Sequence, residues 1–252
     1  MDRLSYHMLV TFRTTPTNKM PTTLIGGSGA LPVDCLQYVA FASDLGDIIK
    51  RGSPAALDFS NLLYPKLTLN AAKILLGKNI ISNRNDAIAV SLFNNLEAMS
   101  LTFTDDQSWW KFLGEIVEST VIKLMEDKYK REILQEKSAQ VTINGKVVAD
   151  LDPKTMDAMA WDISRDQGEM HEIKKAVVSQ ISKPKIKEKL IKMSKFKRGL
   201  ESASGVTIFM GMTTLFETSA VAKKLVNQNL KTGTIDILGR DGIIVWLSRS
   251  YL

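Results

Sequence analysis

Residues 105–137, DDQSWWKFLGEIVESTVIKLMEDKYKREILQEK, form the longest helical pattern in this 252-residue chain. The apolar residues recur every three or four positions, as they do on one face of an α-helix. Thr104 or Asp105 can cap the first turn. The apolar stripe comprises Trp109, Phe112, Leu113, Ile116, Val117, Val121, Leu124, Met125 and Ile133. We therefore predict a helix over 105–137 as the longest element of a mainly helical fold.

The residues before this helix predict a strand, a long loop and more helices. Leu4–Phe12 alternate apolar and polar side chains, with Leu9 out of phase, which is the pattern of a half-buried strand. Residues 14–31 hold two prolines and three glycines without periodicity. They are interpreted either as a surface loop or as the hinge of an arm that pairs with another molecule. Helices are predicted over 32–50, 54–63, 69–76 and 86–99.

The residues after it predict a hairpin and further helices. Asn144-Gly145 lies between two β-branched runs in VTINGKVV (141–148), the strongest short signal for a hairpin. Asp152-Pro153 is typical of a helix start. Asp241-Gly242 suggests a second, C-terminal hairpin. Helices are predicted over 152–163, 169–181, 184–198 (ended by Gly199) and 212–230.

These elements define the expected fold class and organisation. We predict a mainly α (α+β) protein, a single helical domain with small antiparallel β elements. The segments are an N-terminal strand and arm (1–31), a helical N-terminal lobe (32–138) and a helical C-terminal lobe (139–252).

Composition bounds the class of protein. Apolar residues make up 44% and charged residues 24%, as in an ordinary globular domain, and Cys35 is the single cysteine, so no internal disulfide forms. The N-terminus lacks the apolar core of a secretory signal. The apolar run 205–216 is shorter than the roughly 20 residues that span a bilayer. We expect a cytoplasmic protein, soluble or peripheral to a membrane.

No pattern in the sequence predicts catalysis. Gly26, Gly27 and Gly29 fit neither the dinucleotide-binding nor the P-loop spacing, and a surface loop explains them. His7 and His171 have no second histidine at metal-ligand spacing, and His171 is placed on a solvated helix face. We expect no catalytic residues, no metal, no cofactor and no small-molecule substrate. A hydrolase with Ser28 as its nucleophile is the weakest alternative.

The segment 182–198, SKPKIKEKLIKMSKFKR, has the most uneven charge in the chain. From Lys183 to Arg198 it holds eight basic residues and one acidic residue, a net +7, whereas the whole chain carries +6. On a helix, Lys185, Lys189 and Lys192 line one flank together with an aromatic ring. The candidate nucleic-acid-binding residues are Lys183, Lys185, Lys187, Lys189, Lys192, Lys195, Phe196, Lys197 and Arg198. Secondary basic residues are Lys128, Lys130, Arg131, Lys174 and Lys175.

Three interpretations of this basic segment remain open. A solvated helix face is the simplest, although such faces normally mix charge signs. Clustered lysines also suit the phosphates of single-stranded nucleic acid, on which Phe196 would stack a base. Anionic membrane or an acidic protein is the alternative partner, although the apolar stripe is narrow and lacks tryptophan.

The favoured hypothesis is a non-enzymatic, oligomer-forming protein that packages single-stranded nucleic acid, chiefly RNA and without sequence specificity. Residues 1–31 would contact a neighbouring copy. Its general profile is similar to that of small helical nucleoproteins and matrix proteins of RNA viruses, although no motif matches one. The alternative is a matrix-like or adaptor protein that uses the same helix.

Overall fold

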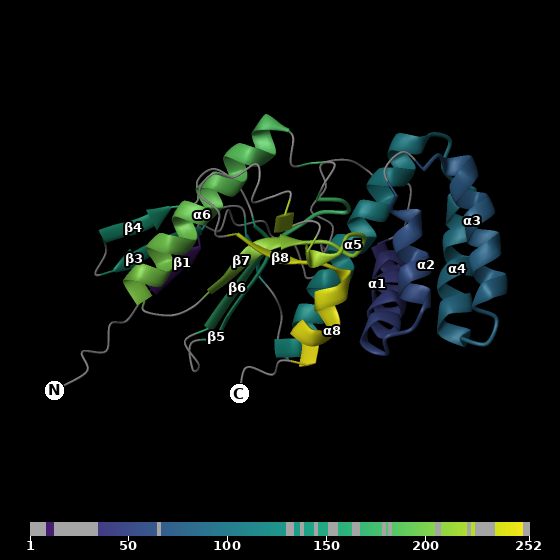
Figure 1. Ribbon diagram of the computed structural model, residues 1–252, viewed down its shortest axis with the longest axis horizontal. Helices are drawn as coiled ribbons and strands as arrows, with labels where there is room; N and C mark the ends of the chain where they lie inside the picture. The colour runs from purple at the N-terminus through teal and green to yellow at the C-terminus, as the bar shows by residue number, and fades with distance from the viewer. Residues whose placement is uncertain are drawn as a thin grey trace.

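The computed structural model describes thirteen segments of the chain. These are residues 9–12, 35–64, 67–129, 134–136, 139–143, 146–150, 156–162, 167–177, 180, 183–204, 208–220, 223–224 and 235–248. They confirm the predicted mainly helical fold with small β elements (Figure 1). The Gly26–Gly29 loop and most of the arm proposed for 1–31 lie outside these residues. Within the described residues, no helix combines the length and apolar character needed to cross a membrane.

Four helices precede the long one, and all four were predicted. They are α1 (Cys35–Lys50), α2 (Ala55–Leu62), α3 (Leu69–Ser82) and α4 (Ala87–Ser100). Side chains cap two of them, because Thr68 accepts a hydrogen bond from Ala71 N–H and Asp86 accepts one from Ala89 N–H. Only α3 is clearly longer than predicted, by six residues.

The long helix α5 (Asp106–Tyr129) ends before the predicted boundary at residue 137. Residues 134–136 form strand β2 (Leu134–Glu136) instead. The predicted apolar stripe is the centre of the core, where Trp109, Phe112 and Ile116 are fully buried. The ring of Phe112 lies 5.4 Å from that of Trp109 and 5.7 Å from that of Phe41 on α1. Aromatic contacts thus join α5 to the helices before it.

A small sheet confirms the predicted N-terminal strand and the first hairpin. Strands β3 (Ala139–Ile143) and β4 (Lys146–Asp150) pair antiparallel, and β1 (Leu9–Phe12) pairs antiparallel with β3. The order is β1-β3-β4. Strand β1 therefore pairs within its own chain.

The C-terminal half contains a five-stranded mixed sheet where mostly helices were predicted. Its order is β2-β5-β6-β7-β8. Strands β5 (Met156–Asp162) and β6 (Gln167–Ile173) are antiparallel and replace the helices predicted over 152–163 and 169–181. These segments consist largely of residues that also favour helices, such as Met, Ala and Glu, and the pairing of the strands overrides that preference.

The last elements return to the sheet. Helix α6 (Pro184–Ser204) confirms the predicted basic helix but continues through Gly199. Strand β7 (Ile208–Thr213) pairs parallel with β6, and β8 (Asp236–Leu238) pairs parallel with β7. The helix predicted over 212–230 is wrong at its start, and the C-terminal hairpin is wrong, because α8 (Arg240–Ser248) follows β8. Asp241 lies in the first turn of α8 and accepts hydrogen bonds from Ser219, so a helix start replaces the turn.

The helices lie on both faces of this sheet (Figure 1). On β6, Glu169 and His171 contact side chains of α5 and α8, whereas Glu172, which points to the other face, contacts α6. Strand β6 is therefore covered on both sides. The residues at its end lie where α5 and α6 both reach the sheet.

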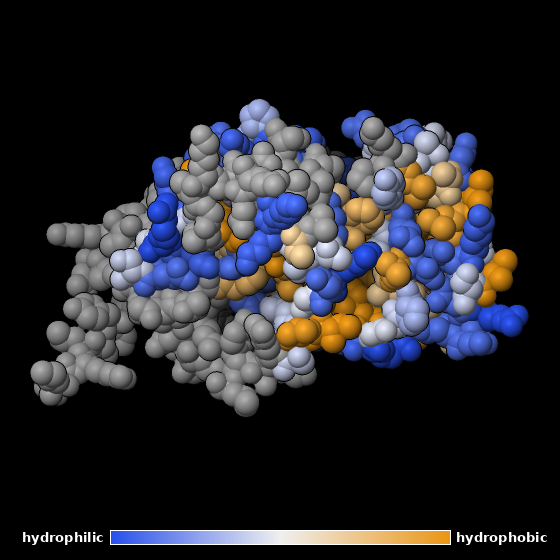
Figure 2. All heavy atoms as spheres, viewed as in Figure 1, coloured by the Kyte–Doolittle hydropathy of each residue, from blue (hydrophilic) through white to orange (hydrophobic). Residues whose placement is uncertain are grey.

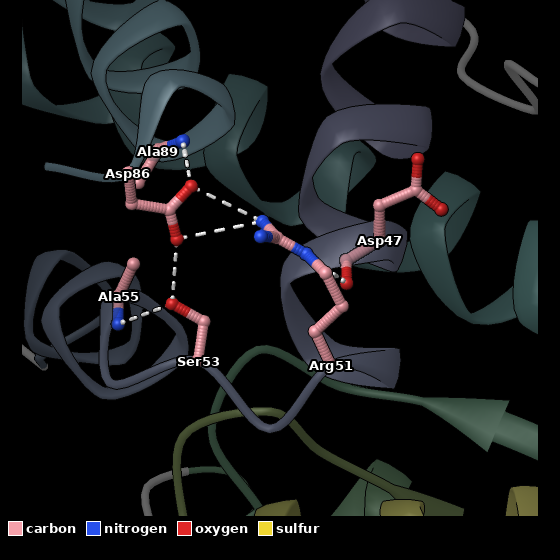
Figure 3. A network of polar contacts seen from close by, with 6 residues as sticks. All are labelled: Asp47, Arg51, Ser53, Ala55, Asp86 and Ala89. Carbon is pink, nitrogen blue, oxygen red and sulfur yellow. Dashed lines mark hydrogen bonds and ion pairs between the residues drawn. The ribbon is translucent and has the colours of Figure 1, made fainter.

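A polar network ties the first helices together (Figure 3). The carboxylate of Asp86 accepts hydrogen bonds from Ala89 N–H at 3.2 Å, Ser53 Oγ at 2.9 Å and the Arg51 guanidinium at 3.2 Å. Slight burial by itself raises the pKa of Asp86, but these donors outweigh it and hold the pKa below its ordinary value. One side chain thus links the ends of α1, α2 and α4.

We expect Asp86→Ala to lower the free energy of unfolding by about 1–2 kcal/mol, because it removes the helix cap and two further contacts. Asp86→Asn should cost less, since asparagine is an equally good cap. Urea denaturation measures both. Ser91→Ala, an exposed change on α4, is the control, and an Asp86→Ala protein as stable as this control would contradict the assignment.

Candidate functional site

Two acidic residues meet on strands β5 and β6. The antiparallel register pairs Ala158 with His171, so the next residues, Asp157 and Glu172, are neighbours on the opposite face. The Asp157 carboxylate also accepts a hydrogen bond from Ile173 N–H at 2.7 Å. Only 15% of the Asp157 side chain and 3% of the Glu172 side chain are exposed. Strand pairing thus brings two largely buried carboxylates together.

Two lysines neutralise part of this charge. The Lys174 ammonium lies 3.2 Å from Asp157 Oδ2 and 2.6 Å from Glu172 Oε1, so it bridges the two carboxylates. Lys189, from α6, forms an ion pair with the other oxygen of Glu172. The three segments β5, β6 and α6 therefore converge on one charged site.

Helix α5 adds two more carboxylates. Burial and the charges of Asp157, Glu115 and Glu172 raise the pKa of Glu118 to about 8, although Lys174 works in the other direction. Burial also raises the pKa of Glu115, with a further contribution from Asp157. We call Glu115, Glu118, Asp157, Glu172, Lys174 and Lys189 the charged cluster. Lys111 also acts on Glu115, so with every group ionised four carboxylates face three ammonium groups, a net −1, which the proton held by Glu118 below a pH of about 8 removes.

The pairing of Asp157 with Glu172 makes the charged cluster a candidate for a divalent cation. As the side chains of the described residues lie, no three or more His, Cys, Asp or Glu are gathered around one point as metal ligands. Mg²⁺, however, usually takes one or two carboxylates and completes its shell with water and substrate phosphates. Asp157 and Glu172 are the two carboxylates in question; 15% of the Asp157 side chain is exposed, and both oxygens of Glu172 are paired with lysines.

A second polar network on β6 lies on the opposite face and is closed to solvent. Glu169 contacts Lys128 at 2.7 Å, His171 Nε2 at 3.2 Å and Trp246 Nε1 at 2.9 Å. Burial by itself raises the pKa of Glu169, but the contacts with His171 and Lys128 outweigh it and lower the pKa to about 2. The side chains of Lys128, Glu169 and His171 are at most 4% exposed. This buried network joins α5, β6 and α8.

The exposed cations of α6 lie beside the charged cluster, because Lys189 belongs to the same helix. Figure 2 shows hydrophilic side chains over the part of the molecule where α6 lies. The exposed basic residues of α6 and of the position just before it are Lys183, Lys185, Lys187, Lys195 and Arg198. We call them the basic face of α6.

Four other predicted binding residues on α6 are placed differently. Phe196 is only 2% exposed, so its ring cannot stack on a base, and that expectation is wrong. Lys197 is 9% exposed and contacts Asp236 at 2.5 Å. Lys192 pairs with Glu188 at 2.9 Å, and Lys189 pairs with Glu172. Of the proposed track of Lys185, Lys189 and Lys192, two lysines are therefore in ion pairs, and only Lys185 has none with a residue that the structure describes.

The secondary basic residues that the structure describes do not add exposed cations to the basic face of α6. Lys128 is buried against Glu169, and Lys174 belongs to the charged cluster. Lys175 donates a hydrogen bond to Trp110 O at 3.3 Å, and burial lowers its pKa to about 8. Lys130 and Arg131 lie outside the described residues. His171 is fully buried in β6, which corrects its predicted place on a solvated helix face.

The sequence contained a signal for the charged cluster that was missed. Asp157 and the run Glu172-Ile173-Lys174 lie in two neighbouring segments that were predicted to be helices. Read as paired strands, these segments place an acid opposite an acid, with a lysine two residues further along. Glu118 was already on the predicted long helix. Comparison of the chain with protein-family models, curated proteins and solved structures gives no match.

The raised pKa of Glu118 predicts how stability changes with pH. The folded protein holds a proton that the unfolded chain releases near the ordinary value of 4.5, so stability should fall as the pH rises from about 4.5 to about 8. Glu118→Gln removes the charge and should stabilise the protein at pH 9 by about 1 kcal/mol or more, with little effect at pH 5. Thermal unfolding at both pH values measures this. Equal shifts at both would contradict the assignment.

Proposed function

We propose that the protein is a divalent-cation-dependent enzyme that hydrolyses phosphodiester bonds in nucleic acid. The observation that carries this proposal is the convergence of Asp157, Glu172 and Lys174 at the end of β6. Glu118 on α5 adds a further carboxylate. The carboxylates and the lysine come from different elements, which hold them in a fixed relation to one another.

This set of residues suits phosphodiester hydrolysis for physical reasons. A divalent cation on the two carboxylates would lower the pKa of bound water and polarise the phosphate. Lys174 supplies a positive charge that can stabilise the negative charge that develops on the phosphate oxygens. Glu118, with its pKa near 8, is poised to exchange a proton near neutral pH.

The basic face of α6 favours nucleic acid as the substrate. Four exposed cations lie on the helix that also contributes Lys189 to the charged cluster, and Lys183 directly precedes this helix. Such a face attracts a chain of phosphates without reading its bases. The net charge of +6 adds to this attraction.

We expect the protein to cleave RNA or DNA in the presence of Mg²⁺ or Mn²⁺ and to lose this activity in EDTA. Asp157→Asn and Lys174→Met should each lower the cleavage rate at least about 100-fold, because each removes a charge that stabilises the transition state. Labelled single-stranded and double-stranded oligonucleotides separated on a gel measure the rate.

Glu97→Gln on α4 is the matched control and should leave the rate unchanged. Cleavage that survives Asp157→Asn, or that is equally fast in EDTA, would contradict the proposed site. Tight binding without any cleavage would instead support the second candidate.

The second candidate is a non-enzymatic protein that packages single-stranded nucleic acid through α6. The basic face of α6 favours it, since these cations suffice for binding without chemistry. Residues 1–31 would then mediate contact between copies. An anionic membrane surface or an acidic protein is the alternative partner for the same face.

Both candidates require that the basic face of α6 binds nucleic acid. The triple variant Lys183→Glu, Lys185→Glu, Lys187→Glu should bind an oligonucleotide at least about tenfold more weakly, and the slope of log K against log salt should fall by about 2. Fluorescence anisotropy at several salt concentrations measures both.

The control is the triple variant Lys73→Glu, Lys78→Glu, Arg84→Glu. It also reverses three charges, two on α3 and one just after it. It should weaken binding much less. Equal losses in the two variants would mean that net charge rather than α6 determines binding.

A further inference from the structure

An apolar cavity lies where α1, α2 and α8 meet. Its volume is about 270 Å³. Its inner walls are buried apolar side chains from these helices and from the segment after β7, namely Leu45, Ile49, Phe59, Ile243 and Leu215. An apolar cavity of about 150 Å³ is enough to hold benzene, so this one has room for a ligand of roughly ten carbon atoms.

The mouth of the cavity is open to solvent. Leu57 on α2 and Ile244 on α8 line it and are 49% and 47% exposed. Figure 2 shows hydrophobic side chains on the surface where α8 lies. The turn after α1 closes one side, where Gly52 has a φ of +62° that other residues rarely adopt. An apolar ligand would therefore enter from solvent and cover apolar surface that is now exposed to water.

Arg240 is the one ionisable side chain among the described residues that line the cavity. It is exposed, and its Nη1 donates a hydrogen bond to Ser60 Oγ at 3.3 Å. No carboxylate of the described residues forms an ion pair with it, and the adjacent Asp241 instead accepts hydrogen bonds from Ser219. A guanidinium has five N–H donors in a planar fork that matches a carboxylate. Arg240 thus has donors left for an anionic ligand.

The other polar side chain at the cavity is already hydrogen-bonded. Ser53 Oγ donates to Asp86 at 2.9 Å and accepts from Ala55 N–H at 3.3 Å (Figure 3). The site therefore offers a single cation beside an apolar cavity, which suits a ligand with an apolar body and one negative charge. A carboxylate carries that charge, whereas a phosphate monoester carries about −1.5 to −2 at pH 7.

We propose that this cavity binds a free fatty acid of about ten carbons, with its chain between the helices and its carboxylate on Arg240. The walls are mainly leucine and isoleucine, and Phe59 is the one aromatic residue among the described residues that line them, so they suit a flexible aliphatic chain. The acid must be free, because an ester would place no charge beside Arg240. None of these lining residues belongs to the charged cluster or to the basic face of α6, so this site is separate from the proposed function.

Calorimetry with decanoate, kept below its micelle concentration at pH 7, tests the proposal. The wild type should bind one decanoate per chain. It should bind hexanoate at least about tenfold more weakly, because each methylene that leaves water adds to the affinity. Decyltrimethylammonium has the same chain with the opposite charge. It should bind at least about tenfold more weakly than decanoate, because its charge repels Arg240.

Two variants separate the charge from the cavity. Arg240→Gln should weaken decanoate binding about tenfold and remove the preference for decanoate over the ammonium compound. Arg84→Gln, an exposed change just after α3, is the control and should bind decanoate as the wild type does. Ala56→Phe places a ring in the cavity and should abolish decanoate binding. Leu57→Ser, at the exposed mouth, should weaken it about fivefold and keeps the test possible if the added ring disturbs folding.

Thermal unfolding gives a second readout. Decanoate should raise the midpoint of the wild type and of Arg84→Gln, but not that of Ala56→Phe, because a ligand stabilises the state that binds it. Absence of saturable decanoate binding to the wild type would overturn the proposal. Binding that is undiminished in Arg240→Gln, or in both Ala56→Phe and Leu57→Ser, would overturn it as well.

Discussion

The antiparallel pairing of β5 with β6 is the constraint on which the rest of the structure depends. It places Asp157 beside Glu172 on one face of the sheet and lines the other face with Ala158 and His171. One face joins α5 and α8 through the buried Glu169 network, and the other meets α6 at Glu172. Two buried carboxylates side by side repel each other, so the fold supplies Lys174 and Lys189 as counterions.

Strand β6 contributes to two different polar networks, one on each face of the sheet. The network around Glu169 and His171 is closed and satisfied, as expected of a structural element. The charged cluster at the end of the same strand brings carboxylates close together, and burial together with their charges raises the pKa of Glu118. Burying carboxylates close together lowers the stability of the fold, and groups with strongly shifted pKa values are often found at functional sites. The basic face of α6 carries the opposite charge on the surface, and the proposed function assigns the phosphates to this face.

Local signals predicted the elements that local chemistry determines. Asp86 marked the start of α4 because its side chain caps the helix, and Asn144-Gly145 marked the hairpin of β3 and β4. Strands β5 and β6 were missed because Asp152-Pro153 resembles a helix start and because their residues favour helices. Only their pairing makes them strands. The charged cluster was missed for the same reason, since Asp157 and Glu172 become neighbours only through the register of these strands. The expectation of a non-enzymatic protein stays a prediction.

The central claim is that β5 and β6 hold a divalent cation with Asp157 and Glu172. Crystals soaked in Mn²⁺ and measured by anomalous diffraction test it most directly. We expect a peak about 2.0–2.5 Å from a carboxylate oxygen of each residue. An empty cluster with both lysines still on Glu172, in crystals that bind Mn²⁺ elsewhere, would contradict the account.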